Sequence, residues 1–306
     1  MIRVFKILLV ACLCLQYSCK QEETKERLTV CFTGDVLLDR GVREAIERKG
    51  GTADFLFEDV SKIFKSSDAT VINLECPITD TITPINKRFV FRGEPEWLPA
   101  LRNSGVTHAV LANNHSMDQG RKGLISTSRH LTNAEICSIG YGENQASSCE
   151  PVFITKDSIQ VALFGVVRLP LENWVSLEDQ PGVCQASIEY LCESIKDLKT
   201  TKPDCHIVIV LHWGSEYQRQ PVIAQRKEAR QLIDAGADAI IGHHPHVIQE
   251  EEIYKGKPIF YSLGNFVFDQ NKPFTDKGLI VRLSFDKDSL SFEKYSVDIK
   301  RCKPYL

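Results

Sequence analysis

Several features that identify large protein classes are missing from this chain of 306 residues. It has no basic run with interleaved aromatic residues, and its net charge is −3, so nothing indicates a nucleic-acid surface. Beyond the N-terminus no apolar stretch is long enough for a transmembrane helix, and after residue 28 there is no repeat or low-complexity tract. With 43% hydrophobic and 25% charged residues, the composition is that of a globular protein.

Thiolate chemistry is not indicated either. Eight of the 11 cysteines follow Cys19, scattered from Cys31 to Cys302 without a Cys-x-x-Cys pair, so neither a thiolate zinc site nor a redox motif is predicted. Cys31 and Cys205 border apolar runs, and we expect both to be buried as small hydrophobic side chains. Spacing alone does not show which cysteines form disulfides.

The N-terminus has the pattern of an export signal. Arg3 and Lys6 precede a short apolar stretch of signal-peptide length. Cys19 follows a serine, and this arrangement resembles a bacterial lipoprotein signal in which Cys19 becomes the lipidated first residue. We therefore expect residues 1–19 to be a signal peptide and residues 20–27 a polar tether. The protein would then be lipid-anchored to a bacterial membrane in the cell envelope.

One departure from the lipoprotein pattern keeps an alternative open. Gln16 stands third before the cysteine, where lipoprotein signals usually carry an aliphatic residue. A plain secretory signal cleaved nearby would instead give a secreted or periplasmic protein. Both interpretations predict export.

The remaining region, residues 28–306, alternates apolar strands with amphipathic helices. We expect strands over 28–33, 69–74, 107–112, 151–154, 160–166, 205–211 and 237–241, and helices over 42–49, 56–65, 96–103, 123–134, 188–198 and 222–235. The alternating stretch 87–92 predicts a hairpin-like edge insertion. The C-terminal third holds strands over 258–261, 278–285 and 289–298 with no helix between them. This order predicts an α/β fold, a layered sandwich with some antiparallel strands.

A histidine-rich turn follows the predicted strand 237–241. Three of the eight histidines lie in the segment GHHPH at 242–246, and His244 and His246 are two residues apart. Imidazole is the commonest protein metal ligand near neutral pH, and a rigid turn can direct two of them at one ion. The turn therefore predicts metal binding, although a surface histidine cluster would have the same sequence.

Matching donors follow four other predicted strands. The candidate ligands at strand ends are Asp35, Glu75, Asn114, His212, His244 and His246. In open α/β sheets the ligand site lies at the carboxyl ends of the strands, so this topology would bring those side chains together. Carboxylate, amide and imidazole donors without thiolate suit Mn²⁺, Fe or Zn²⁺. Two ions about 3.5–4 Å apart would require a bridging carboxylate, for which Glu75 is the candidate.

Each candidate ligand also has an ordinary structural explanation. Asp35 and Asn114 could form turns, Glu75 could be a solvated loop acid, and His212 could be a core histidine. The conjunction of all of them is more specific than any one. The other histidines that lie outside such turns, His108, His130 and His206, are interpreted as structural.

Six segments resemble, in order, the motifs of the CapA-type poly-γ-glutamate synthesis family, which is related to the calcineurin-like metallophosphoesterases. They are 32–40 (FTGDVLLDR), 71–78 (VINLECPI), 111–120 (LANNHSMDQG), 211–217 (LHWGSEY), 241–249 (IGHHPHVIQ) and 261–270 (YSLGNFVFDQ). The resemblance covers residues 28 to 285. It implies a four-layer αββα sandwich of the metallo-dependent phosphatase type, with one or two divalent ions held between the sheets by the six candidate ligands.

The resemblance also implies roles for other residues. His115 takes the place of the histidine that, in the phosphoesterase relatives, stabilises or protonates the leaving oxygen. Asp118, three residues on, would orient His115 as its carboxylate partner. Glu216 and Asn265 recur in the motifs and would line the pocket.

The sequence departs from the phosphoesterase pattern at two motifs. Leu37 stands where the relatives have the histidine of Asp-x-His, and Asn73-Leu-Glu75 replaces their Gly-Asp-x-x-Asp. One ion would therefore have one ligand fewer than in the phosphoesterases, so phosphomonoester hydrolysis does not follow from the fold.

Two functions remain open at this point. One is an envelope-anchored, metal-dependent hydrolase or transferase that acts on a phosphoester, an amide or an anionic polymer. The other is a non-catalytic accessory that binds the polymer through a metal-supported groove. The family name implies capsule formation and, as further partners, other capsule-synthesis proteins. The His115–Asp118 pair favours the enzyme, because a binding groove does not require a proton donor.

Overall fold

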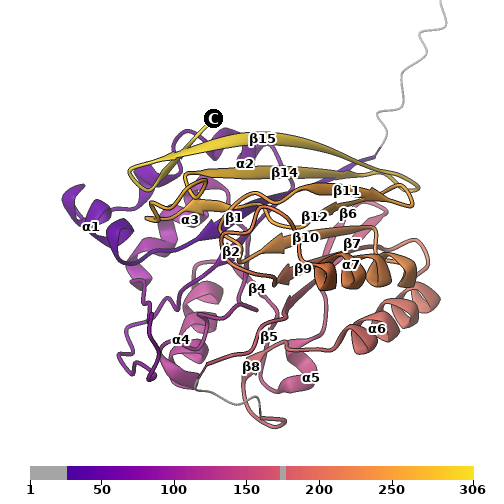
Figure 1. The fold of residues 1–306 in the computed structure, drawn as a ribbon, viewed down its shortest axis with the longest axis horizontal. Coiled ribbons are helices and arrows are strands. Elements are labelled where there is room, and N and C mark those ends of the chain that lie inside the picture. The colour runs from indigo at the N-terminus through magenta and orange to yellow at the C-terminus, as the bar shows by residue number, and fades with distance from the viewer. Residues whose placement is uncertain (1–25, 173–176) are drawn as a thin grey trace, which may run out of the picture.

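The computed structural model describes residues 26–172 and 177–306. The expected signal peptide and its Cys19 lie outside the described residues. Two β-sheets face each other, and helices cover their outer faces (Figure 1). The expected four-layer αββα sandwich is confirmed.

The larger sheet has eight strands in the order β16-β15-β14-β1-β2-β3-β4, with β13 also paired to β1. Its strands are β1 (Leu28–Val36), β2 (Ala69–Leu74), β3 (His108–Val110), β4 (Cys137–Ile139), β13 (Asn265–Val267), β14 (Lys277–Phe285), β15 (Leu290–Lys300) and β16 (Lys303–Tyr305). Strands β1 to β4 run parallel, whereas β14, β15 and β16 are antiparallel neighbours. The last three strands, β14 to β16, thus form one flank of this eight-stranded sheet.

The second sheet has six strands in the order β11-β12-β10-β9-β7-β6. They are β6 (Val152–Lys156), β7 (Ile159–Val167), β9 (His206–His212), β10 (Ala239–His243), β11 (Glu251–Tyr254) and β12 (Lys257–Phe260). Its four central strands are parallel and its two edges antiparallel. A separate two-stranded ribbon pairs β5 (Tyr141–Gly142) with β8 (Gly182–Val183).

The helices divide between the two outer faces. Near the eight-stranded sheet lie α1 (Gly41–Arg48), η1 (Asp54–Leu56), α2 (Ser61–Lys65), η2 (Pro95–Trp97), α3 (Leu98–Ser104) and α4 (Gly120–Asn133). The short α5 (Gln145–Ser148) precedes β6, while α6 (Ile188–Thr201) and α7 (Ile223–Ala235) lie side by side on the six-stranded sheet (Figure 1). Alternate residues of β9 divide between two cores, because successive strand side chains point to opposite faces. Val208 and Val210 join the cluster between the sheets, whereas Ile207 and Ile209 pack under α6 and α7.

Two details of the sequence-based assignment are wrong. Residues 87–92 form no hairpin but belong to a loop, because Lys87 and the backbone of Phe91 bind the buried Asp118. The helix expected over 56–65 is divided into η1 and α2. None of the described helices is long and apolar enough to span a bilayer.

Among the described residues, buried cysteines contribute to packing and two others form one disulfide. Cys31 and Cys205 are buried, as expected. Burial raises the pKa of the Cys31 thiol to about 11, so this thiol is unreactive at neutral pH. Cys149 and Cys184 form a disulfide that joins the segment after α5 to the segment after β8.

Candidate metal centre

The candidate site lies where the carboxyl ends of the two sheets meet. In the eight-stranded sheet, Asp35 of β1 is in register with Asn73 of β2 and Asn265 of β13. In the six-stranded sheet, His212 at the end of β9 is in register with His243 at the end of β10. The parallel order thus aligns strand ends that are far apart in the sequence, as expected of an α/β crevice.

Glu75 is the central carboxylate of the site. It follows β2, is completely buried, and neither of its oxygens has a hydrogen-bond donor among the described residues. Its Oε1 lies 3.7 Å from His212 Nε2 and 3.7 Å from His246 Nε2. Burial raises the pKa of Glu75 well above its usual value, against the opposing charge of His246. A buried carboxylate without donors is costly, and a bound cation would offset that cost.

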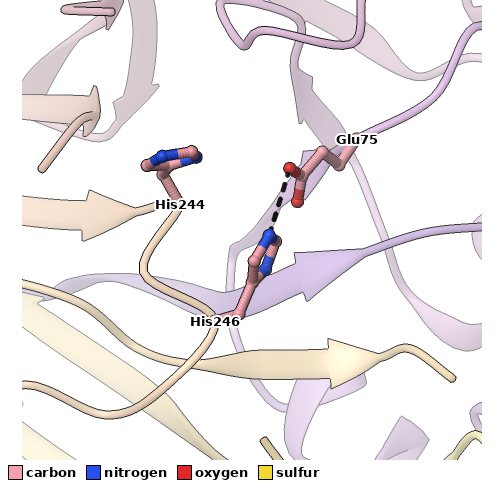
Figure 2. Close-up of side chains that lie close together, drawn as sticks. All are labelled: Glu75, His244 and His246. Atoms are coloured by element: carbon pink, nitrogen blue, oxygen red, sulfur yellow. Dashed lines mark ion pairs between the residues drawn. The ribbon is translucent and has the colours of Figure 1, made fainter. Parts of the chain in front are cut away.

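The turn after β10 presents two imidazoles to Glu75. Figure 2 shows Glu75, His244 and His246 pointing toward one another, and one ligand atom of each lies within 4.8 Å of the others. His244 has φ 95° and His246 has φ 58°, in the left-handed region that non-glycine residues rarely adopt. Such backbone strain clusters at functional sites.

The protonation of the three imidazoles differs. Burial, reinforced by His244, holds the pKa of His212 well below its usual value. Burial, together with His246, lowers the pKa of His244 to about 3. Burial opposes protonation of His246, but Glu75 and Asp35 outweigh it and raise the pKa to about 9. His212 and His244 are therefore neutral, which is the form that binds metals.

Hydrogen-bond donors surround the carboxylate of Asp35. Its Oδ1 accepts from Asn73 Nδ2 at 2.8 Å and lies 3.2 Å from His243 Nδ1, while its Oδ2 lies 3.1 Å from His246 Nδ1. Burial opposes ionisation of Asp35, but His243 and His246 outweigh it and hold the pKa well below its usual value. Asp35 is therefore ionised and orients the histidine turn that follows β10.

The remaining predicted ligand and the pocket residues lie around this cluster. Asn114 Oδ1 is 2.9 Å from His212 Nε2. Asn265 is buried, and its Oδ1 lies 3.0 Å from His246 Nδ1, which fixes the orientation of that ring. Glu216 is exposed and adjoins Tyr217, whose ring centroid is 6.2 Å from that of His246. Glu216 is thus at the rim rather than in the interior.

His115 and Asp118 form a pair beside the cluster. His115 Nδ1 is 2.7 Å from Asp118 Oδ2, and its Nε2 has no partner among the described residues. Lys87 Nζ donates to Asp118 Oδ1 at 3.0 Å and to the Asn114 carbonyl at 2.6 Å. Burial lowers the pKa of His115 despite Asp118, so the neutral ring donates from Nδ1 to Asp118 and presents Nε2 as an acceptor.

Sequence reasoning missed Lys87, Asn73 and His243. The alternation around Lys87 predicted a hairpin-like edge insertion, so its contact with Asp118 was not foreseen. Asn73 lies within the second motif, and His243 within the histidine turn, but their register with Asp35 and His212 becomes apparent only once the strands are paired.

These residues fit a divalent metal ion. The fit is shown by the donor-free oxygens of Glu75 and by His244 Nδ1, which is buried without a partner. The atoms available as metal ligands are oxygens and imidazole nitrogens, a set that Mn²⁺, Fe and Zn²⁺ prefer and soft ions do not.

The sequence profile described as "Bacterial capsule synthesis protein PGA_cap" matches residues 29–270. The matched span contains every residue of the site. The chain belongs to this capsule synthesis family. Its C-terminal strands β14 to β16 lie beyond the matched span.

Relatives in the capsule synthesis family include two Bacillus proteins. The chain is 34% identical to the capsule biosynthesis protein CapA of Bacillus anthracis over 84% of its own length and 64% of the relative's. It is 33% identical to the PGA biosynthesis protein CapA of Bacillus subtilis over 90% of its own length and 73% of the relative's. A probable polyglutamine synthesis accessory protein of Mycobacterium tuberculosis is 31% identical, over 67% of this chain and 56% of the relative. The chain thus spans under two thirds of the first of these.

Solved structures share the fold with this family member. The NAD nucleotidase of Haemophilus influenzae has a TM-score of 0.55 at 13% identity, over 90% of this chain and 50% of that one. A 5'-nucleotidase precursor from Thermus thermophilus has a TM-score of 0.53 at 13% identity, over 91% of this chain and 56% of that one. Both have the metallophosphoesterase architecture, and at this identity the similarity concerns the fold alone.

Proposed function

We propose that this protein is a metal-dependent hydrolase or transferase that acts in the synthesis or release of an anionic capsule polymer such as poly-γ-glutamate. Family membership and the names of the Bacillus relatives support the capsule role. The observation that carries the metal-dependent part is Glu75, a buried carboxylate without donors that faces three imidazoles.

One or two ions of Mn, Fe or Zn would be held by Glu75, His212, His244 and His246, with Asn114 and Asp35 completing the set. A metal bound there would supply Lewis acidity, which polarises a phosphoryl or carbonyl oxygen. Glu75 lies equally far from His212 and His246, which suits a bridging position. Leu37 is fully buried where a further histidine would serve the second ion, so we expect one ion to be held more weakly.

His115 would transfer the proton of the reaction at Nε2. Asp118 holds the Nδ1 proton and so fixes both the tautomer and the orientation of the ring. Lys87 neutralises Asp118 and ties the 84–92 loop to the site. In this arrangement Nε2 accepts a proton from an attacking nucleophile or, once protonated, delivers one to a leaving group.

The alternative is a non-catalytic accessory that binds the polymer during synthesis or export. The name of the Mycobacterium relative and the exposed rim at Glu216 favour it. The His115–Asp118 pair favours the enzyme, because a polymer-binding groove does not require a positioned proton carrier.

The experiment that separates the two is metal analysis of the purified protein, followed by an activity screen. Phosphoesters and γ-glutamyl amides are offered with Mn²⁺ added, to the wild type and to His246→Ala. Turnover that is lost with the bound metal supports the enzyme. Bound metal without turnover on either substrate class supports the accessory.

We further propose that the protein is anchored in the cell envelope through lipidated Cys19. The capsule role and the Cys149–Cys184 disulfide support export, because structural disulfides persist in oxidising compartments. Cys19→Ala should release the protein from the membrane fraction. An unchanged distribution would leave only a cleaved secretory signal or an uncleaved anchor.

A further inference from the structure

Arg40 lies one aromatic ring away from two histidines of the site. Its guanidinium carbon is 4.9 Å from the ring centroid of Phe91 and 5.5 Å from that of Phe268. The Phe91 ring in turn lies 4.2 Å from His115, and the Phe268 ring lies 4.8 Å from His246, measured between centroids. The positive charge of Arg40 is therefore held beside both the proton carrier and the metal centre.

The Arg40 guanidinium has N–H groups without a hydrogen-bond acceptor among the described residues. Arg40 Nη2 donates to Asp269 Oδ1, while Asp269 Oδ2 accepts from the Gly41 backbone N–H at 3.0 Å. Asp269 is the only acceptor of the guanidinium among the described residues, and Nε is buried without a partner. The side chain is 33% exposed. A planar fork with free N–H groups matches a carboxylate or a phosphate in a bidentate manner.

The backbone of Arg40 is strained. It has φ 52° and ψ −125°, a conformation that favours glycine. An arginine in a position suited to glycine indicates a requirement for its side chain, because such strain clusters at functional sites. The next residue, Gly41, has no side chain, and a Cβ there would lie 2.9 Å from Asp269 Cβ, so the arrangement depends on both residues.

Lys87, another cation near the site, has no unpaired donor that could bind a substrate anion. Its side chain is 5% exposed and already donates to Asp118 and to the Asn114 carbonyl. Lys272 lies farther out, with its ammonium 3.6 Å from the centroid of the Tyr217 ring. Of Arg40, Lys87 and Lys272, Arg40 combines an unpaired N–H group with contacts to Phe91 and Phe268, whose rings lie beside His115 and His246.

We propose that Arg40 binds an anionic group of the substrate, a carboxylate or a phosphate, next to the bond that reacts. The proposal rests on the proposed function, because it concerns the substrate of that same centre. It makes Arg40 a specificity-determining residue that selects charged over neutral substrates.

The test measures binding to the full chain by calorimetry, with and without Mn²⁺. The probes are inorganic phosphate, a γ-linked triglutamate peptide and the same peptide with its carboxylates amidated. Arg40→Gln should weaken binding of the charged probes about 10- to 100-fold, the usual effect of losing a hydrogen bond to a charged group. The amidated peptide should bind equally weakly to wild type and variant. Arg40→Lys keeps the positive charge but lacks the planar guanidinium, so the charged probes should bind with an affinity between those of wild type and Arg40→Gln.

Arg48→Gln is the matched control, because Arg48 ends α1, the helix that Arg40 precedes, is 69% exposed and, among the described residues, forms an ion pair only with Glu44. It should leave all affinities unchanged. If only one charged probe weakens with Arg40→Gln, that probe identifies the anion. Equal binding of both charged probes to wild type and Arg40→Gln would overturn the proposal, as would a wild type that binds neither.

Mn²⁺ content, measured in the same samples, separates the two proposals. Weaker anion binding at unchanged Mn²⁺ content supports the role of Arg40 and also shows that the variant is folded. Wild-type protein that retains no Mn²⁺ would contradict the proposed metal centre. In that case the Arg40 effect in the metal-free titration still decides the anion proposal.

Discussion

The two sheets bring different chemistry to the same site. The eight-stranded sheet and its loops contribute oxygen donors, from Asp35, Glu75 and Asn114. The six-stranded sheet contributes nitrogen donors, from His212, His244 and His246. Neither sheet carries all six candidate ligands. The site therefore exists only because the apolar core between the sheets holds their carboxyl ends together.

The two sides also differ in how their polar groups are satisfied. Asp35 is surrounded by donors, whereas Glu75, which follows the adjacent strand, has none. Fully buried carboxylates are normally paired, so Glu75 is the exception in the site. With a metal bound as proposed, Asp35 would orient the histidines and Glu75 would contact the ion.

The largest expected effect separates the proposed proton carrier, His115, from the histidines proposed as metal ligands. His115→Ala should lower turnover by about 10²–10⁴-fold, the usual contribution of a positioned proton carrier, and leave metal content unchanged. His246→Ala should lose metal and turnover together. Metal content by mass spectrometry and single-substrate kinetics measure the two effects. Equal loss of metal in both variants would make His115 a ligand.

A second effect tests how closely backbone segments approach Gly34 in the eight-stranded sheet and Gly242 in the six-stranded sheet. A Cβ at Gly34 would lie 2.2 Å from the Gly264 carbonyl oxygen, and one at Gly242 would lie 1.9 Å from the Tyr261 carbonyl oxygen. Gly34→Ala and Gly242→Ala should each destabilise the protein by about 3 kcal/mol or more, because backbone must move. Gly182→Ala is the control, since its nearest neighbours lie 3.9 Å away. Urea unfolding that ranks the control with the other two would refute this packing.

A third effect tests the unpaired carboxylate. In the presence of chelator, Glu75→Gln should be more stable than wild type by about 1–3 kcal/mol, because it removes a buried carboxylate without donors. Added Mn²⁺ should then raise the melting temperature of wild type but hardly that of the variant. Glu44→Gln, on the exposed face of α1, should behave like wild type. An equal Mn²⁺ response in Glu75→Gln would show that Glu75 is not a ligand.

The smallest effect concerns the opposite end of β10. Burial opposes ionisation of Asp238, but Lys257 at 2.6 Å and Lys199 at 3.0 Å outweigh it and lower the pKa. The stabilisation is present above the unfolded-state pKa of about 4 and is lost as pH falls through the lower folded-state pKa. Asp238→Asn should lower the free energy of unfolding by about 1–2 kcal/mol at pH 7. It should also weaken the dependence of stability on pH below about 4, without changing Mn²⁺ binding. A change in Mn²⁺ binding would link the two ends of the sheet.

The sequence predicts the parts of the fold that have long periodic patterns. The strand at 69–74 matches β2 to the residue, and α6 and α7 lie where their amphipathic patterns place them. Short strands such as β4, β13 and β16 were not predicted, because three residues carry no period. The strand-end donors could be found because each follows an apolar run. Lys87 could not, because its position depends on a loop that is held by long-range contacts to Asp118, the Asn114 carbonyl and Gln119.

Anomalous diffraction from crystals soaked in Zn²⁺ tests the central claim most directly. The account predicts a peak about 2.0–2.2 Å from a Glu75 oxygen and from the imidazole nitrogens of His244 and His246, with His212 in the same cluster. This peak would place oxygen donors from one sheet and nitrogen donors from the other on one ion. A peak elsewhere, or no peak between the sheets when zinc is bound in solution, would contradict it.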